Sequence, residues 1–331
     1  MVDSEQISAS KAIQQQTGRT FHFATRLLPP RVRYPTYILY AFFRVADEVV
    51  DAADTAPPPQ QRAELERLAA EALGAEEPTS PVLAAFAETA ETYAIDPADI
   101  RVFIDAMAAD IATDEYATLE ELRGYMDGSA AAVGRMMTAI MGPELPAAAL
   151  PHATALGEAF QLTNFLRDVR EDVLERDRVY LPAATLERAG TSPAAVRALR
   201  WSPAFARAIE ELLETTEELY REGVAGIRYL PGDCQFGVLL AAILYAEHHR
   251  LIRAADHDVL AQTPQLGPLR KLRLYLAARI RWALRPDPET VFAQVSAVPT
   301  PEPAPDEPMG GFARWRPRRV WRWVEAKTGW E

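Results

Sequence analysis

Apolar residues recur every three or four positions along almost the whole chain, which is the spacing of a helix with one buried face. No stretch alternates apolar and polar residues as a half-buried strand does. Prolines fall between the periodic stretches, so they indicate helix boundaries. The pattern predicts an all-α protein with helices at about residues 4–16, 37–51, 62–73, 81–93, 100–111, 119–141, 146–177, 201–229, 236–255 and 268–282.

The predicted helix at 146–177 carries one polar stripe on a mostly apolar surface. The stripe residues are spaced by three, four and four positions, which places them on one helix face: Gln161, Asn164, Asp168 and Asp172. Leucine, phenylalanine and valine cover much of the remaining surface. A helix this apolar should be buried, although its stripe ends in two carboxylates about one turn apart.

The helix at 37–51 repeats this device with spacings of four, three and four: Tyr40, Arg44, Asp47 and Asp51. A lone Asp-x-x-x-Asp pair is more often a solvated helix face. Its repetition on a second apolar helix favours two stripes that face each other across a cavity. Cations between the stripes would offset the burial of the carboxylates, and oxygen ligands that share a metal with phosphates favour Mg²⁺. The two stripes therefore predict a diphosphate-binding site.

Small residues are concentrated in the predicted helix at 119–141. Gly128 and Gly134 lie in a run of alanines that follows Tyr125. Glycines at such positions allow close backbone approach or a helix kink. The segment forms either a tight helix–helix contact or a slot in which a long, flat substrate chain lies.

Composition narrows the possible partners. The formal net charge of -12 argues against nucleic acid. Cys234 is the only cysteine, which excludes an internal disulfide and a thiolate metal site. The N-terminus has neither the basic start nor the apolar run of a signal peptide, and no stretch approaches the ~20 apolar residues of a membrane-spanning helix. We expect a cytoplasmic protein.

The last part of the chain differs in character from the rest. We divide the sequence into an all-α domain at 1–290 and a tail at 291–331, which contains a proline-rich linker from Pro299 to Pro308. Four of the six tryptophans follow the linker, among six arginines and lysines and two glutamates. Tryptophan and arginine together favour the headgroups of an anionic membrane, so we expect the tail to contact the inner face of the cell membrane. The alternatives are docking on the acidic body of the chain and plain disorder.

The two stripes also resemble a known pattern. Tyr40-x3-Arg44-x2-Asp47-x3-Asp51 and Gln161-x2-Asn164-x2-Arg167-Asp168-x3-Asp172 are similar to the two aspartate-rich motifs of the squalene/phytoene synthases, and the second continues into Arg178-Val-Tyr180-Leu-Pro182. The resemblance extends from about Thr17 to about Tyr275. It implies a single-domain, isoprenoid-synthase-type helical bundle whose central cavity is flanked by two Asp-rich helices, with residues 1–290 as the catalytic domain.

The resemblance also implies roles for individual residues. The metal ligands would be Asp47, Asp51, Asn164, Asp168 and Asp172, and these aspartates with Arg44 and Arg167 form the expected catalytic set. Arg178 and Tyr180 are expected to close over the leaving group. Aromatic side chains that could wall the pocket and stabilise a cation are Phe21, Tyr37, Tyr40 and Tyr245, with ordinary core packing as the alternative for each. The complete expected substrate-binding set is Thr20, Phe21, Tyr37, Tyr40, Arg44, Tyr125, Gln161, Asn164, Arg167, Arg178, Tyr180 and Tyr245.

The implied reaction is a Mg²⁺-dependent head-to-head condensation of two prenyl diphosphates, with Mn²⁺ as a possible substitute. One substrate ionises and alkylates the other to give a cyclopropylcarbinyl diphosphate, which ionises again and rearranges. Proton loss then gives phytoene or dehydrosqualene, whereas hydride from NADPH gives squalene. The run from Ile227 to Cys234, together with Tyr245, is more similar to the phytoene-forming members.

We therefore expect two geranylgeranyl diphosphates as substrates, phytoene as the product in carotenoid biosynthesis, and no NADPH. The alternative is squalene or dehydrosqualene formation from two farnesyl diphosphates. An alternative of another class is a non-catalytic helical scaffold. Such a relative would be expected to lose stripe aspartates, and all four are present.

Overall fold

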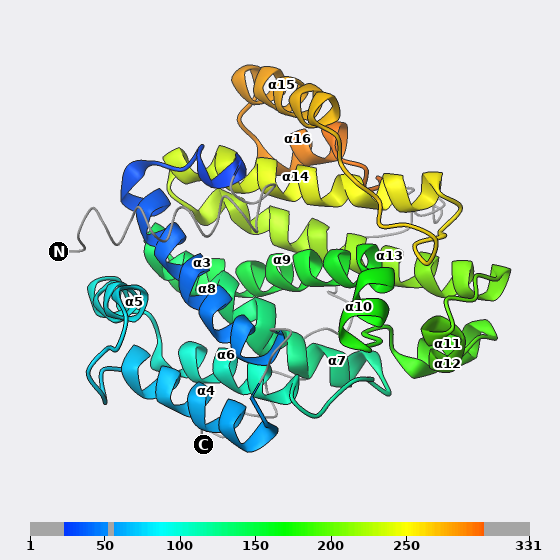
Figure 1. The fold of residues 1–331 in the computed structure, drawn as a ribbon. Coiled ribbons are helices and arrows are strands. Elements are labelled where there is room, and N and C mark those ends of the chain that lie inside the picture. The colour runs from blue at the N-terminus through cyan, green and yellow to red at the C-terminus, as the bar shows by residue number, and fades with distance from the viewer. Residues whose placement is uncertain (1–22, 52–55, 301–331) are drawn as a thin grey trace, which may run out of the picture. The chain divides into compact units, whose positions relative to one another are not determined.

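The computed structural model describes residues 23–51 and 56–300, and these residues confirm the predicted all-α class (Figure 1). Their one extended pairing is an isolated bridge between Glu115 and Val179. The elements are α3 (Pro30–Asp51), α4 (Pro58–Ala72), α5 (Pro81–Thr92), α6 (Pro97–Ala109), α7 (Leu119–Met126), the π-helix η1 (Asp127–Ala131), α8 (Ala132–Met141), α9 (Pro146–Arg167), α10 (Val169–Arg176), α11 (Ala183–Ala189), α12 (Pro193–Arg197), α13 (Pro203–Ala225), the 3₁₀ helix η2 (Gly226–Tyr229), α14 (Gly232–Ala254), α15 (Pro268–Leu284) and α16 (Pro288–Val295).

Prolines begin most of these helices, as the sequence predicts. The expectation is wrong at Pro35 and Pro151, which lie inside α3 and α9. Proline has no N–H, so Pro35 cannot donate to the carbonyl oxygen of Arg31. The hydroxyl of Tyr93 donates to that oxygen instead, at 2.9 Å. A tertiary contact thus replaces the missing helical hydrogen bond.

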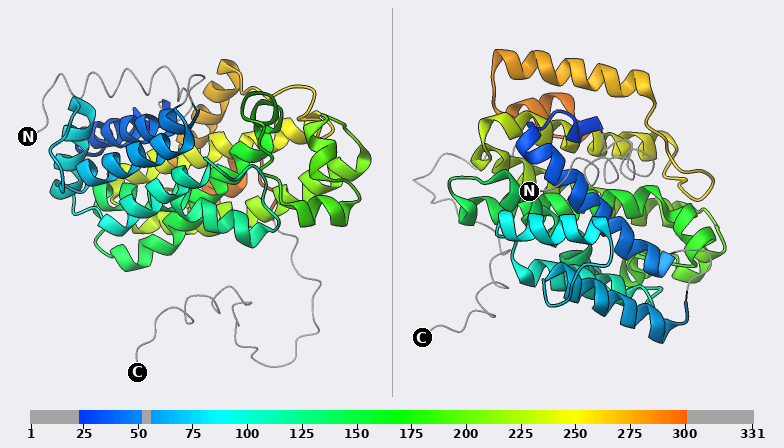
Figure 2. Two further views of the ribbon diagram at one scale, coloured as in Figure 1. Left: turned by 60° about the horizontal axis from the view of Figure 1, so that its bottom comes forward. Right: turned by 60° about the vertical axis from the view of Figure 1, so that its left-hand side comes forward.

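Helix α9 lies at the centre of the bundle and packs against α7, α8, η1, α13, η2 and α14 (Figure 1). Helix α3 crosses on one side of it, against α5, α6 and α8. A second apolar core lies beneath α10–α13, around Phe205 and Leu213. Helix α15 lies on the outside, against α14 and α16 (Figure 1, Figure 2).

The expected single helix at 146–177 is interrupted. Helix α9 ends at Arg167, Asp168 has φ −101° and ψ 12°, and α10 begins at Val169. The amide of Asp168 still donates to the carbonyl of Asn164, and that of Asp172 to the carbonyl of Asp168. The prediction of one unbroken helix is therefore wrong at Asp168, which lies in the corner where the chain changes direction.

The small-residue segment shows both effects that its glycines allow. A Cβ on Gly128 would lie 2.2 Å from the carbonyl oxygen of Val102, and one on Gly134 would lie 2.5 Å from that of Ala153. The segment also leaves the α-helical register, because η1 is a π-helix between α7 and α8. Such π-turns are frequent at functional sites.

The body of the protein continues past the expected boundary at residue 290. Helix α16 crosses that boundary, and Val291 and Phe292 are buried in the main core. One compact unit ends at Pro299. The predicted helix at 4–16 and the tail beyond residue 300 lie outside the described residues. No helix in the described ranges is both long enough and apolar enough to cross a membrane.

Candidate active site

A cavity of about 510 Å³ lies between α3, α8, α9 and α14. Its lining on α9 runs from Ala149 to Arg167, a span of about 27 Å at about 1.5 Å per residue. Eight of the residues expected from the sequence line it: Tyr40, Arg44, Asp47, Tyr125, Gln161, Asn164, Arg167 and Tyr245. The polar members of this set gather towards one end.

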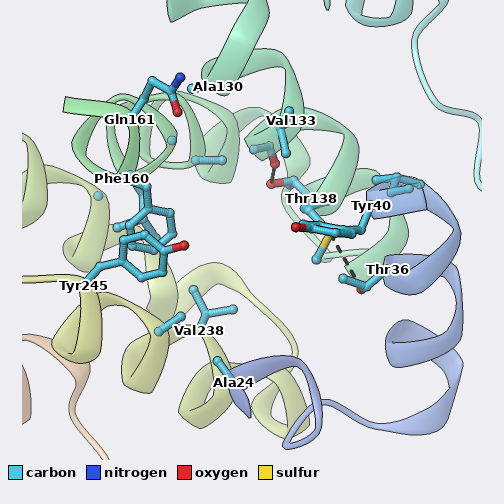
Figure 3. A pocket seen from close by; sticks show the side chains of 18 of the residues that line it. Ala24, Thr36, Tyr40, Ala130, Val133, Thr138, Phe160, Gln161, Val238 and Tyr245 are labelled. Atoms are coloured by element: carbon cyan, nitrogen blue, oxygen red, sulfur yellow. Dashed lines mark hydrogen bonds between the residues drawn. The ribbon is translucent and has the colours of Figure 1, made fainter. Parts of the chain in front are cut away.

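The middle and far end of the cavity are apolar and aromatic. The rings of Phe160 and Tyr245 lie beside each other, with centroids 4.8 Å apart. Figure 3 shows these two rings on one side of the cavity and Tyr40 on the other. The far end is lined by Leu28, Met137, Met141, Ile227, Leu230 and Val238.

The two acidic motifs meet next to the polar end, where Asp47 is the one of their four aspartates that lines the cavity. The guanidinium of Arg176 contacts Asp51 at 3.0 Å and Asp172 at 3.2 Å, so a single guanidinium bridges the carboxylates of the two motifs. Arg176 was not among the residues expected from the sequence. Its spacing of four from Asp172 was a signal for the pair on α10, but the contact with Asp51 spans 125 positions.

Arg178 reaches the same place from the loop after α10. Its guanidinium contacts Asp51 at 2.9 Å and the carbonyl oxygen of Asp110 at 2.9 Å. The chain returns through Asp177, whose left-handed backbone (φ 53°, ψ 35°) ends α10. This turn brings Arg178 back towards α3.

Asp110 is a fifth acid at this end, and the sequence analysis missed it. It caps α6, and its buried carboxylate accepts a hydrogen bond from the hydroxyl of Tyr125 at 2.9 Å. The hydroxyl of Tyr180 donates to its other oxygen at 3.5 Å. Nothing in the local sequence distinguishes Asp110 from an ordinary helix cap.

Burial shifts the pKa of three acids of this cluster, Asp47, Asp110 and Asp172, in the same direction. Burial raises the pKa of Asp172 to about 7, and the nearby Asp168 adds to the shift against the attraction of Arg176. Burial likewise raises the pKa of Asp110 to about 7. The pKa of Asp47 is also raised, by burial and then by Asp51. By formal charge, the five aspartates at this end outnumber by one the four arginines that contact them, Arg44, Arg167, Arg176 and Arg178.

Two further arginines pair with acids of the motifs. Arg44 contacts Asp47, and the guanidinium of Arg167 binds both carboxylate oxygens of its neighbour Asp168. Arg44 also has a buried Nε with no hydrogen-bond partner in the described residues. A buried N–H without a partner is destabilising, so this donor is available to a ligand.

The oxygen atoms of this cluster are donors of the kind that a divalent cation needs. In the described ranges no three acidic, histidine or cysteine side chains are grouped closely enough to hold a metal ion. The chemistry nevertheless fits a hard cation: the carboxylates are oxygen donors with excess negative charge, and the amide Oδ1 of Asn164 is buried without a partner within 23–51 and 56–300. Side-chain rotation that releases the arginines would free these oxygens.

Other expected residues lie away from the cavity. Tyr37 does not line it: this side chain is 2% exposed and packs in the core, which is the alternative that the sequence left open. Tyr180 also lies outside the lining and stacks on Phe165, with ring centroids 4.1 Å apart. Thr20 and Phe21 lie outside the described residues.

A second buried polar network lies on the other side of α9. Thr163 Oγ1 is 2.9 Å from the hydroxyl of Tyr220 and 3.2 Å from Nε2 of His249. The other ring nitrogen of His249 contacts Glu217, which also binds Arg253 at 2.6 Å. These residues follow the ordinary helical period, so no local pattern predicts the network.

Comparison with known proteins agrees with this geometry. A family model described as squalene/phytoene synthase matches residues 14–273. The chain is 32% identical to a phytoene synthase of Pseudescherichia vulneris over 270 residues, which cover 79% of this chain and 87% of that protein. It is 31% identical to the 15-cis-phytoene synthase of Synechocystis over 281 residues, which cover 80% of this chain and 82% of the relative.

Solved structures give the same fold. A dehydrosqualene synthase in complex with a ligand superposes with a TM-score of 0.77 and 25% identity, over 85% of this chain and 97% of that chain. Squalene synthase HpnC from Alicyclobacillus acidocaldarius superposes with a TM-score of 0.68 and 23% identity, over 76% of this chain and 95% of the other.

Proposed function

Because the chain belongs to the squalene/phytoene synthase family, we propose that it is a phytoene synthase that joins two geranylgeranyl diphosphates head to head. It is a prenyltransferase of isoprenoid biosynthesis. The observation that carries the choice of product is the 31–32% identity to phytoene synthases over about four fifths of the chain. The likeness to a dehydrosqualene synthase structure favours the second candidate, which uses farnesyl diphosphate.

The polar end of the cavity would hold the diphosphates. The guanidinium groups of Arg44 and Arg167 line the cavity there and can donate to phosphate oxygens. Arg176 and Arg178 do not line the cavity but form ion pairs with Asp51. Arginines that leave their carboxylates for a phosphate would expose oxygen ligands at the moment when the substrate arrives.

A divalent cation, Mg²⁺ or Mn²⁺, would be held by the oxygens of Asp47, Asp51, Asn164, Asp168 and Asp172. It would supply positive charge to the departing diphosphate. Asp172, with a pKa of about 7, gives up its proton near neutral pH and so can become a ligand there. Asp110 lies behind the motif acids and adds negative charge to the same region.

The rest of the cavity would shield the reacting chains from water. Tyr40, Phe160 and Tyr245 present aromatic faces next to the polar end, where positive charge would develop (Figure 3). The apolar lining towards Met141 and Leu230 fits isoprenoid chains. The proposed reaction ends in loss of a proton and does not use NADPH.

The experiment is incubation of the purified protein with Mg²⁺ and geranylgeranyl diphosphate in the absence of NADPH. Phytoene among the extracted products supports the proposal. Product formation only from farnesyl diphosphate contradicts it and supports squalene or dehydrosqualene synthesis, with the NADPH requirement separating these two. Failure to release diphosphate from either substrate would support the scaffold reading.

We further propose that the tail after residue 298 contacts an anionic membrane surface in the cytoplasm, on the basis of its arginines and tryptophans. Co-sedimentation with liposomes tests this contact in a variant truncated after Val298. Unchanged lipid binding of the truncated protein would contradict the role of the tail.

A further inference from the structure

Helix α15 exposes a continuous apolar stripe. Five large aliphatic side chains, spaced by three or four residues, are each between 48% and 82% exposed: Leu269, Leu272, Leu276, Ile280 and Leu284. They make up half of the large apolar side chains that are exposed in the described residues. Only Leu274 and Ala278 of this helix are buried. Isolated exposed leucines are common, but a stripe along a whole helix indicates a binding surface.

The same helix is strongly basic in an acidic protein. Between residues 268 and 285 there are six basic residues and no acidic one: Arg270, Lys271, Arg273, Arg279, Arg281 and Arg285. Arg270 pairs with Glu247, at 2.9 and 3.0 Å. Arg273 and Arg285 are exposed, and neither side chain pairs with an acid in the part of the chain that the structure describes. The stripe is therefore flanked by positive charge.

The inner face of α15 contacts the segments that wall the apolar end of the cavity. Tyr275 packs edge-on against Phe23 and Phe236, with ring centroids 6.3 and 6.2 Å apart. The residues next to these two phenylalanines, Ala24 and Gly237, line the cavity. One layer of side chains thus separates α15 from the part of the cavity that the hydrocarbon chains would occupy.

We propose that α15 lies flat in the headgroup layer of an anionic lipid membrane, with its leucine stripe in the lipid. An amphipathic helix with arginine and lysine around an apolar face binds such a surface without spanning it. A second copy of α15 and the arginine-rich tail both carry positive charge, so they would be repelled from this face. Lipid binding here does not depend on the proposed function; only the delivery of an apolar product to the membrane through this face rests on it.

The first test measures binding of the full chain, without substrate, to two kinds of vesicle. One contains phosphatidylcholine alone and the other also contains phosphatidylglycerol. We expect the protein to bind the anionic vesicles preferentially and high salt to weaken the binding. Replacing Leu272→Ser and Leu276→Ser together should lower the partition coefficient at least about tenfold. Replacing Arg273→Gln and Arg285→Gln should lower it about fivefold for each charge.

The matched control is Leu73→Ser with Leu145→Ser, two leucines that are 38% and 62% exposed on other elements. This control should bind vesicles like the unchanged protein. Turnover of a detergent-dispersed substrate should be unchanged in the Leu272/Leu276 variant, which shows that the bundle is folded. A partition coefficient equal to that of the unchanged protein would overturn the proposal, because the leucine stripe would then make no contact with the lipid.

The second test identifies what covers the stripe. Cys234 is buried and is the only natural cysteine, so Leu276→Cys allows an environment-sensitive dye to be attached at one exposed position. The dye should report water in the free protein and an apolar surrounding after anionic vesicles are added. An apolar surrounding before vesicles are added would overturn the proposal. Light scattering would then assign the cover to a second copy if the protein is dimeric, or to a segment of its own chain if it is monomeric.

Discussion

Two buried clusters of acids and arginines lie on opposite sides of α9, and the pKa values of Asp172 in one and Glu217 in the other are shifted in opposite directions. At the polar end of the cavity, burial raises the pKa of Asp172 to about 7. In the network under α13 and α14, burial also acts to raise the pKa of Glu217, but hydrogen bonds from His249 and Arg253 outweigh it and leave the pKa below its ordinary value. The same residue types thus form a strained cluster and a satisfied one.

The difference lies in how many partners each carboxylate has. Glu217 shares Arg253 with Glu210, but it is also contacted by His249, and no second acid is among the main influences on its pKa. Asp172 shares the guanidinium of Arg176 with Asp51 and also lies near Asp168. A cluster with excess negative charge is suited to bind cations, whereas a balanced one holds helices together. The direction in which the pKa of a buried carboxylate is shifted thus distinguishes a candidate cation site from a structural ion-pair network, even where no sequence motif is known.

The largest expected effect is on catalysis at the strained cluster. Asp168→Ala should lower turnover at least about 1000-fold, because it removes a ligand of the cation that would meet the charge of the leaving diphosphate. Helical content by circular dichroism should be unchanged, since Asp168 lies at the existing break between α9 and α10. The matched control is Glu210→Gln in the network of Glu217 and Arg253, which should keep near-normal turnover. Near-normal turnover of Asp168→Ala would rule out a role for this carboxylate.

Removing a carboxylate should change the free energy of unfolding with opposite sign in the two clusters. Glu217→Ala should lower the free energy of unfolding by about 3–5 kcal/mol, because His249 loses its buried carboxylate partner and Arg253 loses one of its two. Asp172→Asn should instead raise it at about pH 8, because an ionised carboxylate whose folded-state pKa is raised destabilises the fold there. Urea unfolding of both variants measures the two changes. Equal losses in both variants would show that the clusters do not differ.

The next largest effect concerns the stability that Mg²⁺ binding adds, which should depend on pH. Asp172 holds its proton in the folded state up to about pH 7, so its contribution to stability is present below the unfolded pKa and is lost as the pH rises through 7. A cation competes with that proton. The Mg²⁺-dependent gain in stability should therefore be larger at about pH 8 than at about pH 6, by about 1–3 kcal/mol. Thermal unfolding with Mg²⁺ or EDTA measures this gain.

In Asp172→Asn the difference between the two pH values should shrink. Glu217 behaves in the opposite way, because its pKa is lowered: its contribution is present above the unfolded pKa and is lost only as the pH falls through the folded value. A Mg²⁺ effect that is equally large at both pH values would contradict the assignment of Asp172 as a ligand.

The smallest expected effect concerns the geometry of one donor. Arg44→Lys keeps the charge beside Asp47 but removes the buried Nε that has no partner in the described residues. We expect KM for the prenyl diphosphate to rise about tenfold while kcat falls less, because lysine cannot bind a phosphate through a planar fork. Arg31→Lys, at the surface pair with Asp233, is the control. An unchanged KM would show that Arg44 serves only Asp47.

The sequence by itself determined the helical class, where most of the long helices lie and the faces on which the motif residues lie. Periodicity fixes the side of a helix on which a residue projects, which is why Tyr40, Arg44 and Asp47 line the cavity together. Periodicity does not show what approaches from another part of the chain. Arg176 on Asp51 and Tyr180 on Asp110 join residues 125 and 70 positions apart, and only the tertiary structure brings them together.

The tertiary structure also decided local features that helical propensity could not. The sequence around Asp168 is consistent with an unbroken helix, but the chain turns there. Tyr37 lies close to the motif in sequence, yet its side chain faces the core. The leucines of α15 have the spacing of a buried face, and only packing shows that they lie on the outside. The hydrophobic pattern indicates which side chains are removed from water. The packing of the other helices decides whether the protein itself covers them.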